Sequence, residues 1–167
     1  MANIFARLGN GEKAKECLDL LVRFCTGTNL YTHHNDWRNM GVTLKYMHAG
    51  HAPFQIDANL GFTAGVYEML MYSDNTKIKL LPALPKSWKR GSVENLHARG
   101  GYTVSISWDE RTVKAKITSQ RGAPINVGIK GAMLQNVEPC VQKSVYGDAY
   151  VCLNLAKGES VELIYTR

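Results

Sequence analysis

The chain has 167 residues, of which 45% are hydrophobic and 20% charged, and its formal net charge is +6. This balance indicates a globular protein with a buried core and excludes a disordered segment. The cations are scattered, with Lys86, Lys89 and Arg90 as the one close group, so we expect a solvated basic surface and no nucleic-acid partner. The sequence predicts no signal peptide, and it contains no apolar run long enough to span a bilayer.

The chain begins with a helical pattern. Residues 4–8 are expected to end one helix, which Gly9 and Gly11 would break, and a second helix is expected over about residues 12–24, capped by Asn10. Its apolar stripe recurs every three or four residues, at Ala14, Leu18, Leu21, Val22 and Cys25. The stripe predicts a helix that packs on a core and carries no chemistry.

The four cysteines have neither the spacing of a metal site nor the density of a disulfide framework. Cys17 and Cys25 are too far apart along one helix to bridge each other, and we interpret them as small core residues. Cys140 and Cys152 follow in the C-terminal part. Cysteine usage therefore leaves the cellular compartment open.

Turn-forming residues are frequent between residues 28 and 50, although residues 37–47 could form a short helix. This region has a group of histidines that suggests a metal site: His33, His34, His48 and His51. Gly50 and Pro53 argue against a regular helix that would place His48 and His51 on one face. We therefore favour solvated loop histidines and expect no metal.

The segment from His51 to Gly61 contains a carboxylate, Asp57, among apolar residues. A carboxylate in such surroundings is either hydrogen-bonded for structure or placed for chemistry, because a buried unpaired charge is costly. A helix is expected over about residues 60–72, ended by Ser73, Asp74 and Asn75. Asp57 or Asn59 would then stand where a side chain caps the first turn.

Beyond this helix the pattern changes to that of strands. Residues 77–81 are expected to form a strand, and Pro82 and Pro85 mark the end of the helical part. Apolar residues then alternate with polar ones over residues 103–108, 113–118, 125–129, 151–155 and 161–165, which predicts an antiparallel β-sandwich. The paired glycines at 100 and 101 suggest a turn or bulge. Trp88 and Trp108 could stack on a sugar, but we favour core packing.

Three motifs in this order resemble the C-terminal part of glycoside hydrolase family 95, which contains α-L-fucosidases and α-L-galactosidases. They are residues 51–70, residues 80–88 (Leu-Leu-Pro-Ala-Leu-Pro-Lys-Ser-Trp) and residues 98–102 (Ala-Arg-Gly-Gly-Tyr), within a match from about Phe5 to Trp108. The resemblance implies an α+β chain. Residues 1–80 would be the last helices of an (α/α)6 catalytic barrel, and residues 81–167 a C-terminal antiparallel β-sandwich.

The resemblance also implies chemistry: inverting, exo-acting hydrolysis of α-linked L-fucose in a fucosylated glycan, without a cofactor. In the family a Glu is the general acid, and an asparagine made basic by an adjacent Asp activates the water. Asp57 matches that Asp, and His51 matches a histidine that binds the sugar. Ala52, Ala58 and Leu60 depart from the usual family residues and put the preference between L-fucose and L-galactose in doubt.

The family's Glu and asparagine pair match no residue of this chain, so we expect it to be catalytically incomplete alone. Helix surfaces left without barrel neighbours would then favour self-association. A family enzyme of full length would be periplasmic or extracellular. The alternative is a non-catalytic carbohydrate-binding or structural β-sandwich module.

Overall fold

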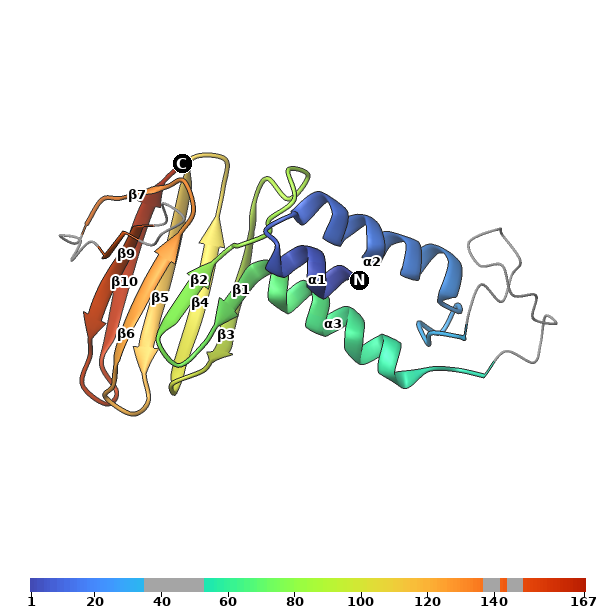
Figure 1. The fold of residues 1–167 in the computed structure, drawn as a ribbon, viewed down its shortest axis with the longest axis horizontal. Helices are drawn as coiled ribbons and strands as arrows, with labels where there is room; N and C mark the ends of the chain where they lie inside the picture. The colour runs from blue at the N-terminus through green and yellow to red at the C-terminus, as the bar shows by residue number, and fades with distance from the viewer. Residues whose placement is uncertain (35–52, 137–141, 144–148) are drawn as a thin grey trace.

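The computed structural model describes residues 1–34, 53–136, 142–143 and 149–167. Within these ranges, three helices lead into two five-stranded sheets. Figure 1 shows the helices extending to one side of the stacked sheets, which gives the molecule an elongated shape. The α+β class expected from the sequence is confirmed.

The first two helices, α1 (Ala2–Arg7) and α2 (Gly11–Cys25), are separated by Gly9, whose φ of 74° ends α1. The expected cap of α2 is confirmed, since the Asn10 side chain accepts a hydrogen bond of 3.0 Å from the backbone N–H of Lys13. Leu18 is buried, whereas Val22, one turn later on the same stripe, is 48% exposed. The apolar stripe of α2 is therefore only partly covered. No described helix is long and apolar enough to cross a bilayer.

The third helix, α3 (Ile56–Leu70), begins and ends earlier than the sequence suggested. The expectation that residues 73–75 end this helix is wrong, because Met71–Ser73 forms strand β1 and Asp74 begins a hairpin turn to strand β2 (Lys77–Leu80). The Asp74 side chain accepts hydrogen bonds from the backbone N–H groups of Thr76 and Lys77, at 2.8 and 3.0 Å. These bonds favour a turn at Asp74 over another helical turn.

The first sheet has the strand order β1-β2-β6-β9-β8. Its remaining strands are β6 (Pro124–Ile129), β8 (Gln142–Lys143) and β9 (Ala149–Asn154). All its pairs are antiparallel except β2 with β6, which is parallel, with Ile78 opposite Val127. The β region is thus rich in antiparallel pairs, with one parallel pair that the sequence did not indicate.

The second sheet is antiparallel throughout, in the order β3-β4-β5-β10-β7. Its strands are β3 (Gly91–Ala98), β4 (Tyr102–Trp108), β5 (Thr112–Ser119), β7 (Met133–Leu134) and β10 (Ser160–Thr166). Gly100 and Gly101 have positive φ and form the turn before β4 that their pairing suggested. Strand β3 was not expected from the sequence. A register shift between Val93 and Leu96 interrupts its alternation of apolar and polar residues.

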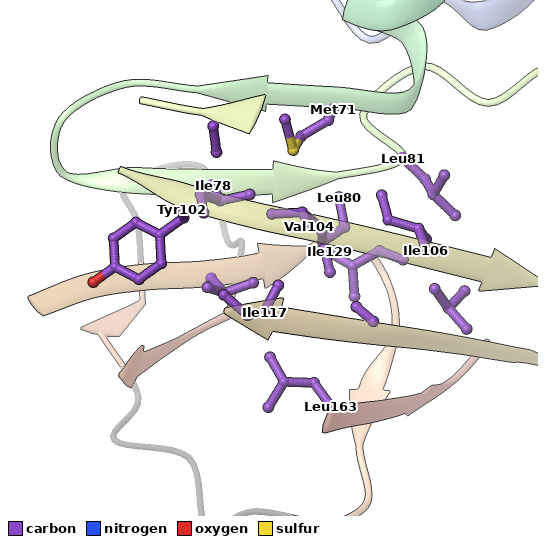
Figure 2. Close-up of a cluster of buried hydrophobic side chains, with 14 of the residues drawn as sticks. Met71, Ile78, Leu80, Leu81, Tyr102, Val104, Ile106, Ile117, Ile129 and Leu163 are labelled. Atoms are coloured by element: carbon purple, nitrogen blue, oxygen red, sulfur yellow. The ribbon is translucent and has the colours of Figure 1, made fainter. Parts of the chain in front are cut away.

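The main core lies between the two sheets and consists of the apolar side chains that alternate along the strands. Figure 2 shows ten of them labelled: Met71, Ile78, Leu80, Leu81, Tyr102, Val104, Ile106, Ile117, Ile129 and Leu163. Eight of these are at most 2% exposed. Because Met71 and Leu81 flank the β1–β2 hairpin, the residues that follow α3 directly belong to this core.

A second, smaller core joins the helices to the segment after β2. It contains Ala6, Ala14, Leu18, Met69 and Ala83. Backbone hydrogen bonds continue the junction, from Leu81 to Leu70 at 2.8 Å and from Ala83 to Met69 at 3.2 Å. The change from helix to strand falls at Leu70 and Met71, and the division into domains at residues 80 and 81 stays a prediction.

Candidate functional site

Asp57 lies in the first turn of α3 and is exposed. It does not cap the helix, because the N-cap residue is Gln55, which makes no side-chain cap bond. Within the described ranges, its carboxylate has neither a hydrogen bond nor an ion pair. The positive end of the helix dipole interacts favourably with a negative charge at this position. Asp57 is thus an exposed carboxylate without a partner among the described residues, and it is not in the buried setting that the sequence suggested.

Asn59 has a different task from the capping role considered for it. Its Oδ1 accepts hydrogen bonds from the backbone N–H and the hydroxyl of Thr32, both at 2.9 Å. Its Nδ2 donates to the carbonyl of Leu30 at 2.8 Å. The Asn59 amide therefore attaches residues 30–32 to α3.

Residues 26–34 also bond to the segment that leads into α3. His33 and Phe54 form an isolated β-bridge, and the Gln55 N–H donates to the Thr32 carbonyl at 2.7 Å. The His34 N–H donates to the Pro53 carbonyl at 2.8 Å. Thr32 is only 3% exposed, so its side chain is buried inside this junction. The N-terminus of α3 is thus held in a fixed position relative to the end of α2.

His51, the predicted sugar-binding residue, lies outside the described residues, as do His48 and Cys140. The sugar-binding role of His51 therefore stays a prediction. Among the residues that the structure does describe, no three His, Cys, Asp or Glu side chains gather closely enough to hold a metal ion.

Exposed apolar side chains lie close to Asp57 in the sequence and on the loop at residues 30 and 31. They are Leu30, Tyr31, Phe54, Ile56 and Leu60, with exposed fractions between 51% and 72%. The rings of Tyr31 and Phe54 contact each other, with centroids 5.6 Å apart and planes inclined by 31°. Exposed apolar groups that gather into a patch mark interaction or ligand sites, and the contact between Tyr31 and Phe54 is the part of such a patch that the structure shows.

A shallow groove of about 360 Å³ lies elsewhere, between α2 and α3 beside Trp88, and Asp57 is not part of it. Its lining is Leu18, Val22, Phe62, Val66 and Trp88, with Lys15, Asp19 and Arg23 at its polar side. Trp108 is buried and donates a 2.8 Å hydrogen bond from its indole N–H to the Trp88 carbonyl. Core packing of Trp108 is therefore confirmed, and its ring is not available to a sugar.

Comparison with known proteins gives the family. Residues 1–70 match the glycosyl hydrolase family 95 catalytic domain, and residues 72–163 match the glycoside hydrolase family 95 C-terminal domain. The chain is 43% identical over 110 residues to alpha-L-fucosidase 2 of Arabidopsis thaliana, covering 65% of this chain and 12% of that protein. It is 34% identical over 139 residues to a probable alpha-fucosidase A of Aspergillus oryzae, covering 75% of this chain and 17% of that protein.

Among solved structures, a GH127 beta-L-arabinofuranosidase from Geobacillus stearothermophilus T6 has a TM-score of 0.39 at 13% identity, over 67% of this chain and 18% of that one. Nothing about function rests on a likeness of this size. The chain spans less than a fifth of the length of the two α-fucosidases above. It belongs to glycoside hydrolase family 95, and it comprises the end of the family's catalytic domain and the C-terminal domain that follows.

Proposed function

We propose that this chain is the C-terminal part of an inverting, exo-acting α-L-fucosidase that removes α-linked L-fucose from glycans. Its family is glycoside hydrolase family 95, and two relatives are named as α-fucosidases. The observation that carries the proposal is the state of Asp57, an exposed carboxylate with no partner among the described residues, within the catalytic-domain match and close in sequence to exposed apolar side chains.

An inverting glycosidase needs an acid that protonates the leaving oxygen and a base that activates water on the opposite face of the sugar. An asparagine amide is a weak base by itself. A carboxylate that accepts the amide N–H increases the electron density on the amide oxygen, which can then take the proton of the attacking water. Asp57 suits this role because no cation in the described part of the chain occupies its oxygens. In this proposal Asp57 positions and polarises the amide, and His51 binds the sugar.

The general acid would come from polypeptide outside this chain. The glutamates of the helices already have structural partners. Glu12 accepts a hydrogen bond from the Lys86 N–H, Glu16 pairs with Lys13, and Glu68 pairs with Arg7. None is free to protonate a leaving group beside Asp57, which supports the view that the chain alone is incomplete.

The first test is turnover by the purified chain. We expect no release of L-fucose from 2′-fucosyllactose or from an aryl α-L-fucoside, even at high protein concentration, because an acid and a base are both missing. Fucose release can be followed by chromatography. Robust hydrolysis by the pure chain would contradict the incomplete-site proposal.

The second test addresses Asp57 directly. In a chimera, this chain replaces the matching segment of the Arabidopsis α-L-fucosidase 2. Asp57→Asn should lower kcat by about 10²- to 10⁴-fold, the usual contribution of general base catalysis, with a small change in KM. The control is Asp19→Asn, which removes a surface carboxylate that pairs with Lys15 on α2. Equal activity of the two variants would exclude a catalytic role for Asp57.

A further inference from the structure

The first turns of α3 are held differently from its last turns. Figure 1 shows that α3 begins at the end of the helical part far from the sheets. The buried residues of α3 all lie at or after Gly65, and none of residues 56–64 is buried in the described part of the chain. The N-cap residue, Gln55, makes no side-chain cap bond. A helix end that is neither packed on a core nor capped frays easily, so the position of the turn that contains Asp57 depends on other contacts.

Thr32 provides such contacts. Its carbonyl accepts a 2.7 Å hydrogen bond from the Gln55 N–H, and its own N–H donates to Asn59 Oδ1 at 2.9 Å. Its hydroxyl lies within hydrogen-bond distance of both the Gln55 carbonyl and Asn59 Oδ1. Asn59 Nδ2 donates in turn to the Leu30 carbonyl at 2.8 Å. Thr32 is buried, so its hydrogen bonds are stronger than the same bonds in water. We call Asn59, Thr32 and the Leu30 carbonyl the Asn59 clamp.

The loop that contains Thr32 is itself attached to the end of α2. Thr26 and Thr32 form an isolated β-bridge, and the His33 N–H donates at 2.7 Å to the carbonyl of Cys25, the last residue of α2. Hydrogen bonds therefore connect the end of α2 to Thr32, and Thr32 to the first turns of α3. The Asn59 clamp thus fixes the start of α3 relative to α2.

Along the chain, Asp57 lies between the two residues that bond to Thr32, which are Gln55 and Asn59. Successive residues of an α-helix are rotated by about 100°, so Asp57 and Asn59 project from opposite sides of α3. Asn59 faces the loop, and the Asp57 carboxylate is exposed on the other side of the helix. The Asn59 clamp therefore acts on Asp57 through the backbone of α3 and not through a direct contact.

We propose that Asn59 is a positioning residue, which through the Asn59 clamp sets the place of the Asp57 carboxylate against the amide that it polarises. This inference rests on the proposed function, because it takes Asp57 as the carboxylate of the reaction. Polarisation of the amide requires a hydrogen bond of about 3 Å. A displacement of about 1 Å in a catalytic site costs about 100-fold in rate. Loss of the clamp should therefore lower kcat, by less than loss of the carboxylate itself.

The test is a double-mutant cycle in the chimera with the Arabidopsis α-L-fucosidase 2, with an aryl α-L-fucoside as substrate. Asn59→Ala should lower kcat by about 10- to 100-fold with little change in KM, because it disturbs the activation of water and not the binding of the sugar. Asp57→Asn combined with Asn59→Ala should have the kcat of Asp57→Asn alone, within about twofold, since a residue that acts through a carboxylate has no effect once that carboxylate is gone. If the two losses multiply, Asn59 acts independently of Asp57, and the positioning role is excluded.

Thr32 offers a second pair of variants, which change the clamp with less risk to the fold. Thr32→Val nearly keeps the shape of the side chain but removes its hydroxyl, so it should lower kcat in the same direction as Asn59→Ala. Thr32→Ser keeps the hydroxyl and should retain most of the activity. Equal activity of Thr32→Val and Thr32→Ser would show that the hydroxyl takes no part in positioning Asp57, which contradicts the clamp.

Asn10→Ala is the matched control for Asn59→Ala. The Asn10 side chain also bonds to a backbone N–H, that of Lys13, but it does so at the start of α2. The substitution should lower the urea midpoint of unfolding without lowering kcat. An equal loss of kcat in Asn10→Ala and Asn59→Ala would mean that general destabilisation explains the effect, and the positioning role would be wrong.

Hydrogen exchange in the purified chain tests the clamp without turnover. In Asn59→Ala the amides of residues 59–62 should exchange about tenfold faster, because the start of α3 loses its attachment, whereas those of residues 66–70 should keep their rates because that end of the helix is buried. NMR spectroscopy resolves the two groups. Unchanged exchange at residues 59–62 would show that the clamp does not hold the start of α3 and would overturn the inference.

The inference and the proposed function fail in different ways. An Asp57→Asn chimera with undiminished fucosidase activity contradicts the proposed function, and the positioning role is then wrong as well. A slow Asp57→Asn chimera together with an Asn59→Ala chimera of normal kcat contradicts the positioning role alone.

Discussion

Two glycines of the helical part differ in what surrounds them. A Cβ added at Gly11 would lie 2.4 Å from the backbone carbonyl oxygen of Ala83, because α2 begins directly against the segment after β2. A Cβ added at Gly61, in the middle of α3, would meet no atom of the described residues within 4 Å. Gly11 therefore permits the close approach of α2 to Ala83. Gly61 has no such neighbour, and it gives α3 a residue of low helix propensity.

Alanine substitution should therefore have opposite effects at the two positions. Gly11→Ala forces the backbone apart and should lower the free energy of unfolding by about 1–3 kcal/mol. Gly61→Ala should raise it by about 0.5–1 kcal/mol, because alanine favours the helix and restricts the unfolded chain. Urea unfolding followed by circular dichroism measures both. Equal changes in the two variants would show that the contact with Ala83 is not tight.

At the residue scale, sequence reasoning singled out Asp57 and Asn59, which lie near the start of α3, but did not predict the partners of Asn59. Asp57 had two candidate roles, capping or chemistry, whereas Asn59 had one, capping. The partners of Asn59 are Leu30 and Thr32, more than 25 positions away, and no local pattern points to them. Asp57 is acidic in a first helical turn, which the sequence allowed, but its exposure depends on which segments cover α3.

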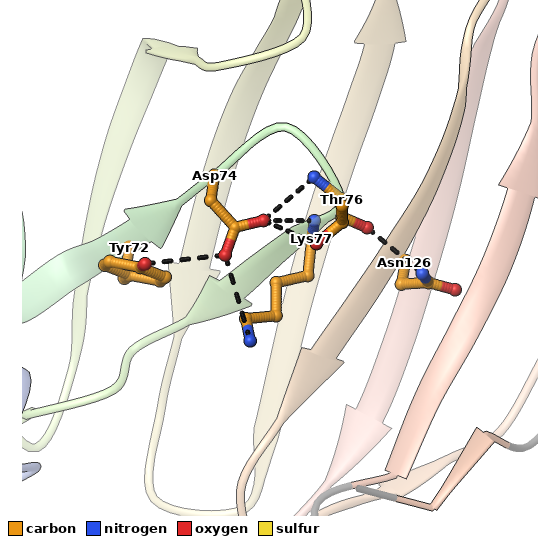
Figure 3. A network of polar contacts seen from close by, with 5 residues as sticks. All are labelled: Tyr72, Asp74, Thr76, Lys77 and Asn126. Atoms are coloured by element: carbon orange, nitrogen blue, oxygen red, sulfur yellow. Dashed lines mark hydrogen bonds and ion pairs between the residues drawn. The ribbon is translucent and has the colours of Figure 1, made fainter.

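At the element scale, the β1–β2 hairpin depends on one carboxylate. Figure 3 shows Asp74 accepting hydrogen bonds from Thr76 and Lys77, with the Tyr72 hydroxyl on its other oxygen. The Lys77 ammonium lies 3.8 Å away, and Asn126 on β6 bonds to the Thr76 carbonyl at 3.0 Å. Burial by itself raises the pKa of Asp74, but the hydrogen bonds from Thr76 and Lys77 and the charge of Lys77 outweigh it and lower the pKa below its ordinary value.

This lowered pKa predicts a pH dependence of stability. The ionised Asp74 stabilises the folded state above the unfolded pKa of about 4, and this contribution is lost as the pH falls through the lower folded pKa. In Asp74→Asn the free energy of unfolding should therefore fall less steeply between about pH 4 and pH 2. Asp109, whose pKa is lowered by backbone hydrogen bonds from Arg111 and Thr112, should keep part of the slope.

Chemical denaturation at a series of pH values measures this slope. Asp19→Asn is a suitable control, because it removes a carboxylate of the α2 surface that takes no part in the hairpin. An unchanged slope in Asp74→Asn would mean that the hydrogen bonds to Asp74 do not depend on its charge.

The elements with clear periodicity were predicted well, and the short or interrupted ones were not. Strands β4 and β5 keep strict alternation and were expected almost to the residue. Strand β1 has three residues, and its sequence continues the apolar run of α3. Its strand conformation comes from its pairing with β2, and the local sequence gives no sign of this pairing. In β3, Asn95 has a φ of 58° and breaks the alternation.

At the scale of the whole molecule, exposed apolar surface is concentrated at one end. In the described ranges, large exposed apolar side chains lie on residues 1–60, with Met133 as the exception. The sandwich has a closed core between its sheets, whereas the helices cover only part of each other. The sequence predicted this imbalance through the family resemblance. The parallel pairing of β2 with β6 joins strands more than 40 residues apart, and no pattern in the sequence indicated it.

This distribution predicts self-association of the chain through its helices. Leu60 on α3 and Met133 on β7 are similarly exposed, at 66% and 71%, so the same substitution can be compared at the two positions. Leu60→Lys should shift the chain towards monomer in sedimentation velocity over a range of protein concentrations, because a charge on an apolar contact must be desolvated. Met133→Lys should leave the sedimentation profile unchanged, since Met133 is the one large exposed apolar side chain in the described part of the sandwich. A chain that is strictly monomeric at all concentrations, or an equal effect of both substitutions, would contradict the assignment of the contact to the helical face.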